Sequence, residues 1–303
     1  GIWSFLAQLD TDTKFHFEIS ADLINDNEIE ILSKAPKGRF QFEVGVQTTN
    51  NEVLRNVNRR VDFEDITQKV KEVKKLNNIM QHLDLIAGLP GENYESFKKS
   101  FNDVYSIRPD EVQLGFLKLI KGSPMRAEAE KWGMAYSPYQ PYEILKTNDI
   151  SYEELIKLKK VEAMVNKYYN TGKFNEIVEY FIPKFETSFD FYYELGMFFQ
   201  EKGYFDRNIT AAEYYRIFLD FNEKIFKEKN NILFEVVKYN YLEHNKKRGI
   251  PTFLCEKVDK KEAKAWKNKV KEVEGIADLS TVLINLEAID IIEYLENGKD
   301  NVK

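Results

Sequence analysis

The chain has 303 residues, of which 43% are hydrophobic and 31% charged, and its formal net charge is −6. This composition excludes a disordered chain and is typical of a globular protein with about two domains. The negative charge argues against nucleic-acid binding, no apolar run is long enough to span a bilayer, and no signal peptide is visible. Its single cysteine, Cys255, permits no internal disulfide. We therefore expect a cytoplasmic location and predict no metal ligands in this chain.

Helices and strands alternate over the first 125 residues. The hydrophobic periodicity predicts helices over 1–9, 22–34, 50–56, 62–76 and 93–106, and strands over 14–20, 40–47, 80–87 and 112–117. Asp62 is predicted to open its helix with a capping-box-like partner at Asp65. Strands that alternate with helices indicate parallel βαβ units with right-handed crossovers. The first part of the chain is therefore predicted to be α/β.

The second part of the chain is predicted to be mainly helical. A Pro- and Tyr-rich loop follows the last strand, and residues 151–245 then carry a helical pattern that begins with a capping box of Ser151 and Glu154. Its aromatic stripe from Tyr168 to Phe199 is interpreted as helix core. Two terminal strands, 252–255 and 281–286, are predicted around a Lys-rich helix at 260–273. The predicted domains are 1–125, a linker at 126–150, a helical domain at 151–295 and a frayed tail at 296–303.

Polar side chains recur along the predicted parallel strands, which are usually apolar on both faces. Alternate side chains of a strand face the same way, so Glu18 follows His16 on one face and Asp84 follows His82. Gln47 ends the strand between them. Because α/β barrels place their chemistry at the carboxyl ends of the strands, these positions predict a site there.

Three segments carry a resemblance to a known superfamily. They are FEVGVQTTNNEVLRNVNR at 42–59, DLIAGLPGE at 84–92 and FHFEI at 15–19. Their order and spacing resemble the radical S-adenosylmethionine (SAM) superfamily, in the class that includes the oxygen-independent coproporphyrinogen oxidases. The resemblance is closer still to B12-binding-domain radical SAM proteins with an uncharacterised helical C-terminal domain. It implies that residues 1–125 form part of a SAM-binding barrel.

The resemblance assigns roles to individual residues. It implies that Glu18 binds the amino group of SAM, and that Gln47 and Arg59 hold the ribose and the carboxylate region. It places Asp84 near the ribose hydroxyls, and Ile86 and Gly88 along the adenine. These chemistries match a ligand with an ammonium, a carboxylate and a diol, since carboxylates accept hydrogen bonds and an arginine fork binds both carboxylate oxygens. No residue is assigned as catalytic.

The chain departs from the superfamily pattern at the iron–sulfur cluster. The superfamily holds a [4Fe–4S] cluster with three cysteines in a C-x3-C-x2-C motif, which this chain lacks. We therefore expect a truncated TIM-like barrel of about four parallel strands, as the C-terminal portion of a larger iron–sulfur enzyme. That enzyme would also use cobalamin if a B12 domain precedes it. This portion alone is expected to be inactive, its small-molecule or peptide substrate is unknown, and edge strand 14–20 is expected to favour a dimer.

Two other functions remain open at this point. Glu18 and Asp84 are compatible with a two-carboxylate hydrolase site in a small α/β barrel, which requires a complete barrel within the chain. A non-enzymatic scaffold, with the aromatic helical domain as its partner-binding surface, is the third hypothesis. A C-x3-C-x2-C motif encoded upstream would favour the radical SAM hypothesis over both.

Overall fold

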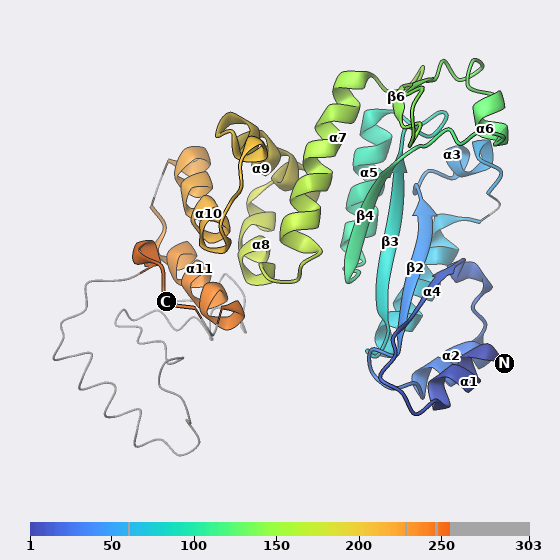
Figure 1. Cartoon of the computed structure of the whole chain (residues 1–303), viewed down its shortest axis with the longest axis horizontal. Coiled ribbons are helices and arrows are strands. Elements are labelled where there is room, and N and C mark those ends of the chain that lie inside the picture. The colour runs from blue at the N-terminus through green and yellow to red at the C-terminus, as the bar shows by residue number, and fades with distance from the viewer. Residues whose placement is uncertain (60, 228, 246–247, 255–303) are drawn as a thin grey trace. The chain divides into compact units, whose positions relative to one another are not determined.

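The computed structural model describes residues 1–59, 61–227, 229–245 and 248–254 (Figure 1). Its contacts divide the chain into two compact units. The first contains residues 1–172 and 185–197, and the second contains residues 173–184 and those from 198 onward. Each unit is described separately below. The domain limits expected from the sequence stay predictions.

A sheet of four parallel strands organises the first unit, in the order β1-β2-β3-β4. The strands are β1 (Phe15–Ile19), β2 (Phe40–Gln47), β3 (Met80–Ala87) and β4 (Glu111–Phe116). The helices between and before them are α1 (Ile2–Gln8), η1 (Ala21–Leu23), α2 (Asp26–Ser33), α3 (Asn51–Asn56), α4 (Phe63–Lys75) and α5 (Tyr94–Ser106). The predicted α/β class with four parallel strands is confirmed.

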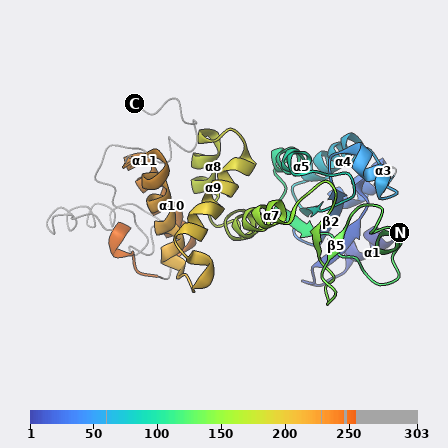
Figure 2. The same ribbon diagram turned by 90° about the horizontal axis from the view of Figure 1, so that it is seen from above.

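The two faces of this sheet differ in polarity. On one face β2 presents Phe40, Phe42, Val44 and Val46, each at most 1% exposed. Helices α4 and α5 lie on the same side of the strands in Figure 2, with their apolar residues buried. Trp3 of α1 packs edge-on against Phe42, with ring centroids 5.3 Å apart. The helices therefore cover the apolar face, and the polar side chains of the strands lie on the other.

The outer edge of β4 is covered by a side chain. After β4 come α6 (Pro124–Ala127), a short antiparallel pair β5 (Ala135–Tyr136) and β6 (Ile144–Lys146), α7 (Tyr152–Met164) and a π-helical turn, η2 (Val165–Tyr169). The Asn170 amide then donates to the Val112 carbonyl and accepts from the Val112 N–H, both at 2.9 Å. It thereby replaces a neighbouring strand at that residue. At the opposite edge, β1 pairs with β2 alone among the described strands, and the dimer expected there stays a prediction.

Aromatic side chains form the core of the second unit. Its elements are α8 (Asn175–Phe181), η3 (Ile182–Lys184), the end of α9 (Ser188–Glu201), η4 (Tyr204–Asp206), α10 (Ala211–Phe226), α11 (Asn231–His244) and η5 (Thr252–Leu254). Phe181 stacks on Phe218 with centroids 5.7 Å apart and meets Phe221 edge-on at 5.5 Å. The interpretation of the stripe from Tyr168 to Phe199 as helix core is confirmed, because most of its aromatic side chains are at most 5% exposed: Tyr168, Phe174, Tyr180, Phe181, Tyr192, Phe198 and Phe199. Among the described residues, no helix is both long and apolar enough to cross a membrane.

One predicted helix start and one predicted capping box are wrong. The helix predicted at 22–34 is split into η1 and α2, because Asn25 forms a capping box with Glu28 and starts a new helix at Asp26. Asp62 makes no side-chain capping bond. The first amide of α4, that of Phe63, instead donates to the Asn51 side chain at 3.3 Å. The Ser151–Glu154 capping box is confirmed.

Two further predictions near the loops need correction. The strand predicted at 252–255 is a 3₁₀ turn over Thr252–Leu254, because the Leu254 N–H bonds back to the Pro251 carbonyl at 2.9 Å. The β5–β6 pair lies in the stretch that the sequence predicts to be a Pro- and Tyr-rich loop. The predicted helix 260–273, strand 281–286 and tail, and Cys255, lie outside the described residues.

Candidate functional site

The polar face of the sheet is built in rows by the strand register. Glu18 of β1 lies beside Glu43 of β2, and Glu43 lies beside His82 of β3. In the next row toward the carboxyl ends, Gly45 lies beside Asp84. Because the strands are parallel and in register, side chains from segments nearly seventy residues apart face the same side.

Three carboxyl groups gather on this face. The pKa of Asp84 is raised well above its usual range, first by burial and then by the neighbouring Glu43 and Glu18 carboxyls. One oxygen of Asp84, Oδ1, is buried and has no hydrogen-bond partner. A buried acceptor without a partner is costly, so the site has unused capacity to bind a donor or a cation.

The two histidines of the face are held by hydrogen bonds. His16 Nε2 lies 2.9 Å from Glu43 Oε2. His82 is buried, with its Nε2 3.0 Å from the Gln41 amide nitrogen and 3.2 Å from Glu111 Oε1. His82 is thus held in the buried part of the face, whereas His16 lies at its exposed side.

The face lacks a side chain at Gly45, and the end of Gln47 lies in this place, which we call the gap at Gly45. A Cβ atom added at Gly45 would lie 2.3 Å from Gln47 Nε2 and 3.4 Å from Arg59 Nη2. Arg59 Nη1 also donates to the Gly45 carbonyl at 3.1 Å. Gln47 has a positive φ of 70°, which is uncommon for a residue with a side chain and turns the end of β2 out of the strand path. The missing side chain at Gly45 thus makes room for Gln47 and Arg59 beside Asp84.

At the carboxyl end of β3, mainly backbone atoms are available for contact with a ligand. Ile86 lies beside Gly115 of β4, where an added Cβ would approach the Leu85 carbonyl to 3.3 Å. Gly88 has a φ of 87°, and its α-carbon faces Ile144, whose Cγ2 would lie 2.8 Å from an added Cβ. Gly88 is therefore required both by the turn and by close packing.

The loop after β3 is tied to the loop after β2 by Glu92. Its side chain is 1% exposed, and Oε1 accepts hydrogen bonds from Thr48 at 2.5 Å, Ser100 at 3.3 Å and Ser96 at 3.4 Å. Burial raises the pKa of Glu92 to about 7, against the lowering effect of these hydroxyls. This carboxyl positions the loop that follows Gln47.

The structure brings most of the sequence-predicted residues to one face. Glu18 and Asp84 are linked through Glu43, and Gln47 and Arg59 meet over Gly45. Gly88 is the exception, because Ile144 covers its α-carbon and leaves only its backbone for contact. Glu43 and Glu92 were not assigned to the site from sequence. The alternation of apolar and polar residues at Phe42 and Glu43 is a sequence signal that places Glu43 on the polar face. No sequence signal indicates that Glu92 is buried.

Comparison with known families matches two adjoining segments of the chain. Residues 2–104 match the radical SAM superfamily. Residues 130–296 match a family described as a protein of unknown function, DUF4080. Strands β1, β2 and β3 and all six site residues predicted from the sequence lie within the first segment, and the second unit lies largely within the other.

Similar curated proteins are tRNA-modifying enzymes. A tRNA-2-methylthio-N(6)-dimethylallyladenosine synthase of Clostridium botulinum is 30% identical over 102 residues, which are 33% of this chain and 23% of that protein. A tRNA uridine(34) acetyltransferase of Methanocaldococcus jannaschii is 30% identical over 150 residues, covering 48% and 26% of the two chains. The chain thus spans about a quarter of the length of these relatives.

Similar solved structures include two radical SAM enzymes. The coproporphyrinogen III oxidase of Escherichia coli aligns over 52% of this chain and 32% of that one, at 22% identity and a TM-score of 0.38. A radical S-adenosylmethionine methyltransferase of Kitasatospora setae aligns over 44% and 27%, at 17% identity and a TM-score of 0.36.

Proposed function

Because this chain belongs to the radical SAM superfamily and to the DUF4080 family, we propose that the polar face of its four-stranded sheet is the SAM-binding surface of a radical SAM enzyme. The observation that carries the proposal is the Asp84 carboxyl, which has a buried, unpartnered oxygen and a raised pKa beside two further carboxyls. An acidic face of this kind is stabilised by a ligand that brings cationic and hydroxyl donors.

The residues of the face fit the parts of SAM. Carboxylates at Glu18 and Glu43 suit its ammonium, and Asp84 suits the hydroxyls of its ribose. Arg59 is exposed and suits its carboxylate, while Gln47 supplies an amide beside the gap at Gly45. The half-buried Ile86 offers an apolar contact to the adenine, and Gly88 offers backbone. SAM bound here would supply the radical chemistry of the superfamily once it received one electron from an iron–sulfur cluster.

The residues do not fit the iron–sulfur cluster. A cubane cluster takes several cysteine thiolates, and the 303 residues contain one cysteine. The cluster ligands of the proposed enzyme therefore do not come from this chain, and neither the reaction nor a use of cobalamin is assigned to its residues. The similar enzymes are named for modifying tRNA. The net charge of −6 of this chain does not favour nucleic-acid binding, so we do not propose tRNA as its substrate.

Binding of S-adenosylhomocysteine tests the proposal. By isothermal titration calorimetry we expect a dissociation constant in the millimolar range, since the cluster that would chelate the amino-acid end is absent. 5′-Methylthioadenosine lacks the ammonium and the carboxylate, so its binding should be weaker by about a hundredfold or more through loss of two charge-assisted hydrogen bonds. Equal affinities for the two ligands, or no binding of either, would contradict the proposed roles of Glu18 and Arg59.

Filling the gap at Gly45 should weaken this binding without unfolding the chain. In Gly45→Ala the new methyl group collides with the end of the flexible Gln47 side chain and touches that of Arg59, so Gln47 has to move into the ligand space. We expect S-adenosylhomocysteine to bind at least about fivefold more weakly, with a change in the free energy of unfolding below about 1 kcal/mol. Gly249→Ala is the matched control, because a methyl group there meets nothing within 4 Å. Unchanged affinity in Gly45→Ala would show that the gap is not part of the ligand site.

A further inference from the structure

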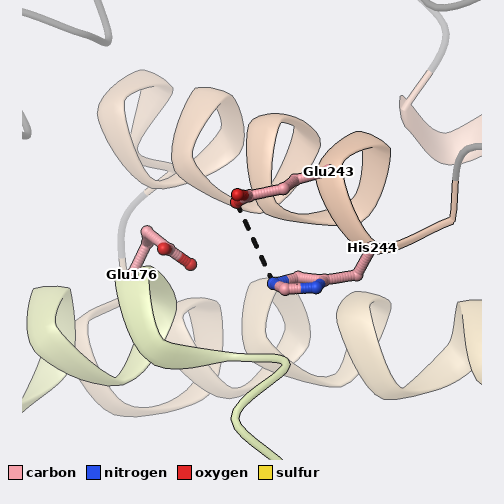
Figure 3. A group of neighbouring side chains, drawn as sticks. All are labelled: Glu176, Glu243 and His244. Carbon is pink, nitrogen blue, oxygen red and sulfur yellow. Dashed lines mark ion pairs between the residues drawn. The ribbon is translucent and has the colours of Figure 1, made fainter. Parts of the chain in front are cut away.

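A second cluster of ligand-type side chains lies in the second unit, apart from the polar face. Glu176 of α8 meets Glu243 and His244 at the end of α11 (Figure 3). One ligand atom from each residue lies within 4.8 Å of the other two. His244 Nε2 is 3.9 Å from Glu243 Oε2. Glu176 is more than sixty positions from Glu243 and His244 in the sequence, so the packing of α8 on α11 creates the cluster.

The spacing of these atoms is close to that of a metal site. Nitrogen and oxygen ligands at about 2.1 Å from one zinc ion are roughly 3 to 4 Å from one another. Separations of up to 4.8 Å would have to close by about 1 to 2 Å to reach this geometry, and Glu243 and His244 are exposed and able to move.

A buried amide beside Glu176 adds a fourth ligand-type side chain to the cluster. Asn240 lies one turn before His244 on α11 and is 0% exposed. Its Nδ2 donates to Glu176 Oε2, which aims the amide at the cluster. Its Oδ1 is buried and has no hydrogen-bond partner. Because amide oxygen and nitrogen can exchange places by a flip, Asn240 is able to turn its oxygen toward a cation bound by Glu176.

The charge of the cluster is not compensated by the described residues. Within the described part of the chain, neither Glu176 nor Glu243 forms an ion pair with a lysine or arginine. Two carboxylates with no cationic partner other than a histidine repel one another and favour a bound cation. Ca²⁺ and Mg²⁺ prefer oxygen ligands, so the histidine nitrogen favours a transition metal over these two ions.

We propose that Glu176, Glu243 and His244, with the amide oxygen of Asn240, form a divalent transition-metal site that ties the end of α11 to α8. Imidazole with carboxylate and amide oxygens suits Zn²⁺ or Mn²⁺. Asn240 and His244 are four residues apart on one helix, and Glu243 is three from Asn240, so both face the same side as Asn240. This site is independent of the proposed SAM-binding face, and the sequence prediction that the chain has no metal ligands is revised by it.

Titration of the metal-free chain with Zn²⁺ and with Mn²⁺ tests the proposal. We expect one ion per chain by calorimetry, and for Mn²⁺ a loss of the free-ion signal in electron paramagnetic resonance. His244→Ala and Glu176→Gln should each weaken binding about tenfold or more, as loss of a ligand does. Metal should also raise the unfolding temperature of the wild-type chain, because it binds the folded state only, and this increase should vanish in His244→Ala.

The control variant is His16→Ala, which removes another histidine that lies beside a glutamate, but on the sheet. It should bind the ion as the wild-type chain does. Loss of binding in His16→Ala with retention in His244→Ala would place the ion on the sheet and overturn the proposal. Retention in both Glu176→Gln and His244→Ala, or no binding by the wild-type chain, would overturn it as well. Asn240→Asp adds a carboxylate and should strengthen binding; weaker binding would remove Asn240 from the ligand set.

Discussion

Replacing Glu18 and Asp84 together by alanine should abolish measurable S-adenosylhomocysteine binding. Each carboxylate is proposed to accept a hydrogen bond from the ligand, Glu18 from the ammonium and Asp84 from the ribose. Charge-assisted hydrogen bonds contribute about 1.5 to 3 kcal/mol each, so the pair accounts for roughly a hundredfold or more in affinity. A millimolar dissociation constant then moves out of the range of calorimetry.

The fold should tolerate this double substitution. Asp84 is a desolvated carboxyl whose pKa is raised by Glu43 and Glu18, so its removal relieves a cost rather than breaking an ion pair. Circular dichroism and urea unfolding should therefore show an unchanged or higher stability. The control removes two exposed carboxylates in the same way, by Glu30→Ala with Glu64→Ala on α2 and α4, and should leave binding intact. Binding that survives in the Glu18 and Asp84 variant would refute the site.

Glu92→Gln should remove much of the pH dependence of stability between pH 4.5 and 8. The pKa of Glu92 is raised from 4.5 to about 7 by burial. A carboxyl with a raised pKa stabilises the fold fully below its unfolded pKa, and this contribution is lost as the pH rises through its folded pKa. The wild-type chain should therefore lose on the order of 3 kcal/mol of unfolding free energy from this group by pH 8. Glutamine stays neutral over this pH range, so Glu92→Gln does not lose this unfolding free energy.

Urea unfolding at pH 4.5, 6 and 8 measures this effect. The difference in stability between Glu92→Gln and the wild-type chain should shift in favour of the variant as the pH rises. Glu95→Gln makes the same chemical change at an exposed position of α5 and should show no such shift. A parallel pH dependence in the wild-type chain and in Glu92→Gln would mean that Glu92 is ionised at little cost. The hydrogen bonds to Thr48 and Ser100 would then outweigh its burial.

The sheet could be predicted from the sequence because its strands have a clear alternation of apolar and polar residues. In β2, apolar residues alternate with polar ones at Phe40, Phe42 and Val44. This period of two indicates a strand with one buried face. The failures lie where a specific contact decides the structure. Asp62 begins α4 without the expected capping bond, while the Phe63 amide bonds to Asn51, and a single turn closed by Pro251 replaced a strand. The amide of Asn170, which covers the edge of β4, has no sequence signal at all.

The site was predictable only in its outline. The strand ends placed Glu18 and Asp84 on one face, but their coupling runs through Glu43 and depends on the register of three strands. That register is a property of the folded sheet. The cluster of Glu176 and His244 was not found, because nothing local indicates that α8 and the end of α11 meet.

A crystal structure of the chain with S-adenosylhomocysteine tests the central claim most directly. The account predicts the ligand on the polar face of the sheet, with its amino group at Glu18 and Glu43 and its ribose hydroxyls at Asp84. Its adenine should lie along Ile86 and the backbone of Gly88. A ligand bound away from this face, with the Asp84 carboxyl still without contact to it, would contradict the account.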